Sequence, residues 1–298
     1  MPWYQLEDPK DSKLDELAKQ YNLHPLHIED CRSENESVKV ETTSRYTFAV
    51  FKPVYLKPDP DYPAQTFPAF STIDIFAGEK DGKPFFITIV ESDCPATREA
   101  LERARRDGDD EHPGRLLYLI LDTIVDLYFP AIDHFDDRID KLEDEVLANP
   151  SPEILQQVFA IKRELIDLRR VLVNTRDASL HLQRDPGSIV DAEHQPYVRD
   201  VYDHVVRLLD SVETQRDLLN STLDIYLSSV ANRTNEVMKV LTILGTIVLP
   251  VIAISGIYGM NLKGLPFEES PHGATYVAAM TVLFTGLLLY YLRKKKWL

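Results

Sequence analysis

Residues 240–258 read VLTILGTIVLPVIAISGIY and include no charged side chain. At about 1.5 Å per residue, a helix of this length spans roughly 29 Å, close to the ~30 Å hydrocarbon core of a bilayer. Residues 274–292, ATYVAAMTVLFTGLLLYYL, are a second uncharged stretch of similar length, and the short segment 259–273 separates the two. This pattern predicts a helical hairpin that crosses a membrane twice. Two buried helices of a soluble domain are the alternative.

Basic residues flank the two stretches on the same side. Arg233 and Lys239 precede the first stretch, and the run 293–296, RKKK, follows the second. The connecting segment 259–273 carries one lysine and two acids. The positive-inside rule therefore predicts cytoplasmic N- and C-termini, an external loop at 259–273 and a basic cytoplasmic tail at 293–298. The expected location is the inner (cytoplasmic) membrane of a cell, with the chain crossing it more than once.

The whole sequence has 298 residues and is acidic, with 48 acidic and 33 basic side chains and a formal net charge of -15 at pH 7. Because phosphate binding needs a basic face, this balance argues against nucleic acid as a partner and fits cations as partners. Two cysteines, Cys31 and Cys94, do not make a disulfide framework, which predicts a reducing compartment for the soluble part. The sequence has no P-loop, G-x-S-x-G or paired-cysteine zinc motif, so we expect no enzyme.

Residues 1–112 carry the pattern of a mixed α/β domain. A helix is expected at 11–21, where Leu14 and Leu17 share one face. The pair His24-Pro25 is interpreted as part of a helix start rather than as a metal site. Strands are expected at 46–56, 71–76 and 84–90, the last two joined by a hairpin turn at Asp81-Gly82, and a further helix at 95–106.

Residues 113–239 are predicted to form a helical stalk region. An apolar stripe over 116–146 indicates a helix, in which Pro130 predicts a kink or a local break. Residues 151–153, Ser-Pro-Glu, provide start signals for a second helix that ends near Arg184.

The last stalk helix is the longest element that the sequence predicts. Residues 197–244 include neither glycine nor proline, and their apolar residues recur at spacings of three, four or seven. This helix and the first membrane stretch are therefore expected to form one rod of about sixty residues, roughly 90 Å long. Such a rod can transmit movement into the membrane, and a simple stalk is the alternative.

The first membrane stretch ends in Tyr258-Gly259-Met260-Asn261. Here the sequence resembles the CorA family of magnesium and cobalt channels, whose signature is YGMN at the end of the first of two transmembrane helices. Residues 199–204, RDVYDH, and 234–241, TNEVMKVL, are also similar to the family, as is the basic ending KKKW. The resemblance implies a funnel-shaped homopentameric channel, in which each subunit has an α/β cytoplasmic domain, a long pore-lining helix and an outer second transmembrane helix.

The resemblance also implies a selectivity filter at Gly259, Met260 and Asn261. Since Mg2+ dehydrates reluctantly, a transport site should bind the hydrated ion, and the neutral amide oxygen of Asn261 accepts hydrogen bonds from its waters. Gly259 permits a tight turn, and Met260 is expected to pack against the loop. A helix C-cap is the alternative interpretation of this glycine and asparagine.

A pore-lining face is expected below the filter. Its members are Asn235, Met238, Leu241, Thr242, Gly245, Leu249, Ile252 and Gly256. The resemblance implies that Asn235 contacts hydrated ions near the inner entrance, while Met238, Leu241 and Leu249 form an apolar constriction that gates by dewetting. Ile252 departs from the family, in which a polar residue, often threonine, stands at this level. Ordinary helix packing is the alternative for each of these residues.

The resemblance implies two regulatory ion sites. Asp30 and Asp200 correspond to carboxylates that share a divalent ion between neighbouring subunits, and Glu29 and Asp122 match a second, nearby site. Carboxylate oxygens are hard ligands that suit Mg2+. Cytoplasmic Mg2+ bound there would hold the subunits in a closed state. A solvated surface charge is the alternative for each carboxylate.

Together these features predict passive, gated influx of divalent cations, chiefly Mg2+ and also Co2+ or Ni2+, closed by intracellular Mg2+. Mg2+ is thus expected as both the transported and the regulatory ion, with the lipid membrane and further copies of the chain as partners. A ZntB-like zinc transporter and a non-conducting, membrane-anchored ion sensor are the alternatives. The intact Gly-Met-Asn sequence favours magnesium over zinc.

Overall fold

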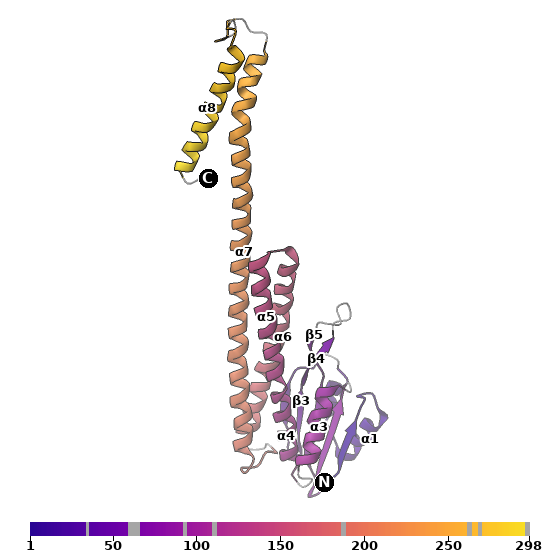
Figure 1. Ribbon diagram of the computed structural model, residues 1–298. Coiled ribbons are helices and arrows are strands. Elements are labelled where there is room, and N and C mark those ends of the chain that lie inside the picture. The colour runs from indigo at the N-terminus through magenta and orange to yellow at the C-terminus, as the bar shows by residue number, and fades with distance from the viewer. Residues whose placement is uncertain are drawn as a thin grey trace. The chain divides into compact units, whose positions relative to one another are not determined.

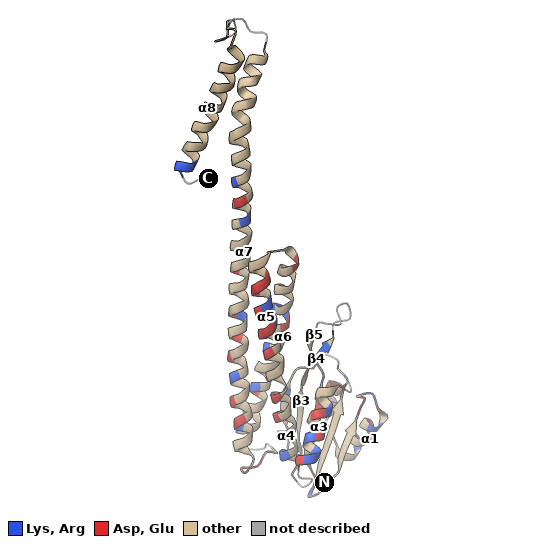
Figure 2. Ribbon diagram, in the orientation of Figure 1, with Lys and Arg blue, Asp and Glu red and all other residues tan. Residues whose placement is uncertain are grey.

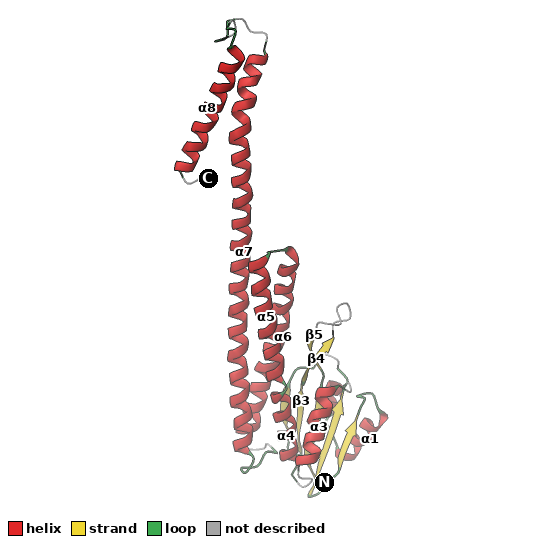
Figure 3. Cartoon of the chain, viewed as in Figure 1, coloured by secondary structure: helices red, strands yellow, loops and turns green. Residues whose placement is uncertain are grey.

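The computed structural model describes residues 1–33, 36–58, 66–91, 94–108, 112–185, 189–260, 264–267 and 270–295. They fall into two compact units, one ending at Leu223 and the other beginning at Asp224. The first unit contains the sheets, most of the helices and the first part of the longest helix, and the second contains the apolar end of that helix and the last helix (Figures 1 and 3).

A five-stranded sheet forms the centre of the first unit, in the order β1-β7-β6-β3-β2. Its strands are β1 (Trp3–Leu6), β2 (Lys39–Thr42), β3 (Tyr46–Phe51), β6 (Ile73–Lys80) and β7 (Lys83–Val90). The edge strand β1 pairs parallel with β7, and the other neighbours pair antiparallel. The predicted hairpin between β6 and β7 is confirmed. Asp81 and Gly82 both have positive φ, at 52° and 73°, as a tight hairpin turn requires.

Helices α1 (Ser12–Tyr21) and α2 (Pro25–Cys31) pack onto the sheet through one apolar cluster, which includes Leu14 and Ile28 with Phe48 and Phe76. The Asp11 carboxylate accepts a hydrogen bond from the Lys13 backbone N–H and so caps α1. His24 caps α2 in the same way, with proline in the first turn, which confirms the helix start predicted there.

The prediction of a single strand at 46–56 is wrong. Strand β3 ends at Phe51, and β4 (Val54–Pro58) begins after Pro53 and pairs with β5 (Thr66–Phe70) in a separate two-stranded sheet. Proline has no backbone N–H to donate to a ladder, so the chain leaves the first sheet at this point.

The predicted helices of the first unit are confirmed. Helix α3 (Pro95–Asp107) precedes α4 (Pro113–Asp126), and α5 (Tyr128–Ala148) begins after a break at Leu127. The break accords with the effect expected of Pro130, which lies in the first turn of α5, where no intrahelical N–H donor is needed. Helix α6 (Pro152–Arg184) follows.

Helices α5, α6 and the first part of α7 (Gln195–Gly259) run side by side (Figure 1). Arg138 of α5 pairs with Glu164 of α6, and Arg169 of α6 pairs with Glu213 of α7. These ion pairs lie outside an apolar interior that contains residues such as Leu165. The three helices thus form a bundle within the first unit.

Helix α7 has 65 residues, which confirms the prediction of one continuous rod and gives a length of about 98 Å. Among the described residues, two helices are long and apolar enough to cross a membrane, namely α7 and α8 (Gly273–Lys294). Residues 240–260 and 270–292 carry no Lys, Arg, Asp or Glu (Figure 2). Most of their large apolar side chains are exposed in the single chain, as surfaces that face lipid or other subunits would be.

Candidate ion pathway and regulatory sites

The expected selectivity filter lies where α7 ends. Gly259 is the last helical residue, and the backbone N–H of Met260 donates to the Ile257 carbonyl at 3.3 Å. Asn261, the third filter residue, lies outside the described residues. The Tyr258 hydroxyl donates to the Pro266 carbonyl at 2.9 Å, which ties the end of α7 to the segment after the motif. The side chain of Met260 is exposed, so the packing expected for it is not made within the described part of one chain.

The expected pore-lining residues all lie on α7. Met238, Leu241 and Ile252 are at least half exposed in the single chain. Asn235 and Gly256 are also exposed. This face is therefore available to other subunits or to an aqueous pathway.

Part of the same face also borders a groove within the second unit. Thr242, Gly245 and Leu249 line it together with Phe284 and Leu288 of α8. The Thr242 hydroxyl donates to the Met238 carbonyl at 2.8 Å, so this side chain is already paired along its own helix. Three of the eight expected pore residues thus lie at the edge between the pore-lining face and α8.

Asp122 lies in a cluster between α4 and α7, in which Asp122 is buried, Asp126 is exposed and His204 is half-buried. Its carboxylate, that of Asp126 and a ring nitrogen of His204 offer ligand atoms that all lie within 4.8 Å of one another. Arg103 of α3 donates to Asp122 Oδ2 at 2.8 Å and to Asp126 Oδ2 at 2.9 Å. Burial raises the pKa of Asp122, as does the negative charge of Asp126, against the opposing effect of Arg103.

Asp200 lies one helical turn before His204 on α7. Its Oδ2 is 3.6 Å from His204 Nε2, and its side chain is 66% exposed. The charge of Asp200 also contributes to the raised pKa of Asp122, so the two carboxylates lie within electrostatic range. His204 Nδ1 is buried without a hydrogen-bond partner among the described residues. The structure thus brings Asp122 and Asp200 into one neighbourhood.

Asp30 and Glu29 lie elsewhere, on α2. Asp30 is half-buried and accepts a hydrogen bond from Lys39, while Glu29 is exposed. Neither belongs to the cluster of Asp122, Asp126 and His204 within the described part of one chain. Their meeting with Asp200 and Asp122 therefore stays a prediction about neighbouring subunits.

The cluster includes residues that the sequence reasoning missed. Asp126 follows Asp122 by four residues, and His204 follows Asp200 by four, so both pairs share a helix face. That spacing was a signal for Asp126 and His204, whereas nothing local pointed to Arg103. The donor set fits a divalent ion, because carboxylate oxygens suit Mg2+ and an imidazole nitrogen also suits Co2+ and Ni2+.

The fold and these sites define an integral membrane protein in which an α/β unit continues through one long helix into two apolar helices. A family model described as CorA-like Mg2+ transporter protein matches residues 1–294, and the chain belongs to that family. The family resemblance seen in the sequence is thereby confirmed.

Individual relatives agree with the family match. The chain is 37% identical over 281 residues to the cobalt/magnesium transport protein CorA of Thermotoga maritima. This match covers 93% of the present chain and 78% of the relative. The complete structure of the CorA magnesium transporter from Methanocaldococcus jannaschii has a TM-score of 0.81 and 26% identity, and the match covers 99% of this chain and 91% of that one. The zinc transport protein ZntB of Pectobacterium carotovorum is 23% identical, over 68% of this chain and 62% of its own length.

Proposed function

We propose that this chain is a channel subunit for passive, gated influx of divalent cations, chiefly Mg2+ and also Co2+ and Ni2+. The observation that carries the proposal is the sequence Tyr258-Gly259-Met260-Asn261 at the end of α7, in a chain that matches the family over residues 1–294. An inside-negative potential contributes about 4.6 kcal/mol to divalent cation entry for each 100 mV, which is sufficient drive for passive influx.

We propose the following route for the ion. It meets Gly259, Met260 and Asn261 at the outer mouth, passes residues 235–256 along α7 and leaves at the cytoplasmic stalk. The amide oxygen of Asn261 binds the hydrated ion weakly enough to release it. The exposed side chains of Met238 and Leu241 supply the apolar constriction.

Assembly and membrane orientation are part of the proposal. Five copies surround the pore, because two hairpins of α7 and α8 can hardly enclose a path for a hydrated ion. Residues 1–112 are the cytoplasmic α/β domain, 113–239 the stalk region, 240–258 and 274–292 the transmembrane segments. The basic residues at 293–296 support cytoplasmic termini in the inner membrane.

Regulation by cytoplasmic Mg2+ is proposed to act through carboxylates at subunit boundaries. Asp30 and Asp200 share one ion, and Glu29 and Asp122 contribute to a second. The juxtaposition of Asp122, Asp126 and His204 supports the second site, because it already gathers hard oxygen ligands in one chain. An ion between facing carboxylates removes their repulsion and so favours the closed arrangement.

The test is cation flux into liposomes that contain the purified full chain, with Mg2+, Co2+, Ni2+ and Zn2+ compared at the same potential. We expect Mg2+ influx. Influx of Zn2+ without Mg2+ would favour the zinc transporter, the second candidate because of the ZntB relative. Absence of all flux from assembled protein would favour the ion sensor.

A further inference from the structure

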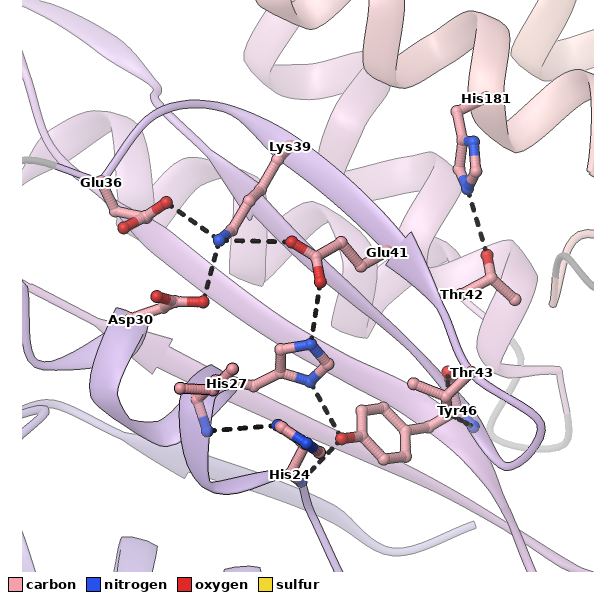
Figure 4. A network of polar contacts seen from close by, with 11 residues as sticks. His24, His27, Asp30, Glu36, Lys39, Glu41, Thr42, Thr43, Tyr46 and His181 are labelled. Atoms are coloured by element: carbon pink, nitrogen blue, oxygen red, sulfur yellow. Dashed lines mark hydrogen bonds and ion pairs between the residues drawn. The ribbon is translucent and has the colours of Figure 1, made fainter.

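The ammonium group of Lys39 lies among three carboxylates at the edge of the main sheet (Figure 4). Lys39 Nζ is 2.8 Å from Asp30 Oδ2, 2.9 Å from Glu36 Oε1 and 3.4 Å from Glu41 Oε1. These groups come from three places in the fold. Asp30 is on α2, Glu36 precedes β2, and Lys39 and Glu41 are on β2 itself. One of the proposed regulatory ligands, Asp30, thus already has a cation within its own chain.

The surroundings hold this lysine in place, because its ammonium group is fixed between Asp30 and Glu36. The side chain of Lys39 is 23% exposed and that of Asp30 is 25% exposed, so water screens the pair only in part. Lys39 is therefore a fixed positive charge rather than a mobile surface lysine.

The backbone and a histidine network hold the arrangement (Figure 4). Strand β2 pairs with β3, with Lys39 opposite Val50. Glu41 Oε2 lies 3.0 Å from His27 Nε2, and His27 Nδ1 lies 2.9 Å from the Tyr46 hydroxyl. The His27 ring stacks on a buried phenylalanine, so Glu41 is anchored from the interior of the domain. Glu41 and the strand pairing thus direct Lys39 toward Asp30.

We propose that Lys39 is a tethered cation that competes with a divalent ion for Asp30 and so raises the Mg2+ concentration at which the regulatory site fills. The inference rests on the proposed role of Asp30. A carboxylate oxygen that accepts from an ammonium must give up that contact before it can coordinate an ion. The free energy of the lysine contact is thereby subtracted from the free energy of ion binding.

Asp122 has the same kind of internal partner in Arg103, but only Lys39 allows a clean test. Asp122 is buried, so removal of Arg103 would leave an uncompensated buried charge and destabilise the chain. The carboxylates around Lys39 all reach solvent, with Glu41 half exposed, and they can lose their internal cation without being left in an apolar interior.

The experiment measures how Mg2+ protects the purified full chain against a protease, a readout that does not depend on conduction. Lys39→Met should move the midpoint of protection to a Mg2+ concentration about tenfold lower, which corresponds to about 1.4 kcal/mol. Lys39→Arg, which keeps the charge, should remain near the wild type. Lys19→Met, at an exposed lysine of α1, is the matched control for loss of one positive charge and should not move the midpoint. Lys39→Gln gives the same comparison if Lys39→Met does not fold.

Asp30→Asn separates failure of this inference from failure of the proposed function. If Asp30→Asn leaves the midpoint of the wild type unchanged, Asp30 is not a regulatory ligand, so the regulation proposed for it and the competition by Lys39 both fall. If Asp30→Asn shifts the midpoint but Lys39→Met leaves it unchanged or raises it, Asp30 is a ligand and only the competition is overturned. In the double variant, Lys39→Met should add nothing to Asp30→Asn, because its effect acts through that carboxylate.

Discussion

At the scale of single residues, the buried carboxyl group of Asp74 is an unusual titratable group outside the proposed ion sites. It lies on β6 and is 3% exposed, and its Oδ1 has no hydrogen-bond partner among the described residues. Burial raises its pKa to about 7, and the nearby charges of Glu91, Glu36 and Asp30 act in the same direction, against a hydrogen bond with Cys31. Between about pH 4 and about pH 7, the carboxyl group of Asp74 therefore holds a proton in the native chain that it has released in the unfolded chain.

This gives a pH dependence of stability with a definite sign. Because the native pKa is raised, stability from this group is fully present below the ordinary aspartate pKa of 3.8 and is lost as the pH rises through about 7. The shift corresponds to at most about 4 kcal/mol. Asp74→Asn should flatten the fall in unfolding free energy between about pH 4 and about pH 7, measured by denaturant unfolding of the full chain. The control is Asp137→Asn, at an exposed position of α5. An unchanged slope in Asp74→Asn would contradict the assignment.

Asn261 is the residue on which selectivity is expected to depend. Asn261→Ala removes the amide oxygens that accept hydrogen bonds from the hydrated ion, so Mg2+ uptake should be abolished while assembly stays intact. Uptake into cells or liposomes, with oligomer content measured in parallel, checks this. Asn232→Ala, at an exposed position lower on α7, should transport as the wild type does. Uptake at the wild-type level by an assembled Asn261→Ala protein would contradict the proposed role of Asn261 in selectivity.

At the scale of elements, the sequence predicts helices well and strands poorly. The continuous α7 follows from its freedom from glycine and proline over 197–244, a signal that needs no tertiary information. Strands β1, β2 and β5 were missed, because they are short and their pairing lies far away in the chain. Trp3 of β1, for example, pairs with Phe86 of β7. No local pattern records such a partner.

The same physical reason limits what the sequence says of the proposed ion sites. Family resemblance supplied Asp122 and Asp200, but the cluster also needs Asp126 and His204 from helices that only the fold brings together. The contact of Lys39 with Asp30 depends on where β2 joins the sheet. Residue spacing can indicate neighbours on one helix, such as Asp126 beside Asp122, but partners from other elements, such as Arg103 and Lys39, are properties of the packed molecule.

The β6–β7 turn offers a test at the level of an element. Gly82 has a φ of 73°, and the nearest atom to a Cβ built there is 3.8 Å away, so backbone strain rather than space opposes a side chain. Gly82→Ala should lower the free energy of unfolding by about 1 kcal/mol. Asp81→Gly, in the same turn with a φ of 52°, should not destabilise, because glycine accepts this conformation. The measurement is denaturant unfolding of both variants, and equal stability of Gly82→Ala and wild type would show that the turn has another conformation.

At the scale of the whole molecule, formal charge is absent from the two apolar stretches and concentrated in the rest of the chain. The described residues 240–260 and 270–292 carry no formal charge, whereas the net charge of the full chain is -15. In the proposed orientation, an acidic cytoplasmic part attracts cations toward the inner end of the pore, and the basic residues 293–296 hold the end of the last helix on the cytoplasmic side. Orientation is therefore a consequence of sequence that can be tested directly.

Glu268→Cys tests the orientation, since Glu268 belongs to the expected external loop. An impermeant thiol reagent added from outside intact cells should label this cysteine. The native Cys31 and Cys94 are both buried, and burial further raises the pKa of Cys31, so background labelling should be low. The chain without the substitution is the control. Labelling of Glu268→Cys only from the cytoplasmic side would reverse the proposed topology.

The proposed gating involves the whole assembly, and Asp200 is the residue through which it can be tested. Its side chain is 66% exposed in the single chain, so it is free to meet a neighbouring subunit, and His204 lies only 3.6 Å away. Asp200→Ala removes a ligand but also relieves repulsion between carboxylates, so its effect on the resting closed state has no fixed sign. Its effect on the response to Mg2+ does have a fixed sign. An ion shifts an equilibrium only through its differential affinity for the two states, so loss of a ligand weakens the extent to which added Mg2+ favours the closed state.

Asp200→Ala should therefore keep conducting at internal Mg2+ concentrations that close the wild type. The measurement is current against internal Mg2+ for both channels, with oligomer content determined in parallel. Asp203→Ala is the matched control, because it removes the same charge from an exposed position on the same helix three residues away. Superimposable inhibition curves for Asp200→Ala and wild type would place regulation elsewhere. Equal loss of inhibition in both variants would mean that net charge on α7, rather than a bound ion at Asp200, controls closure.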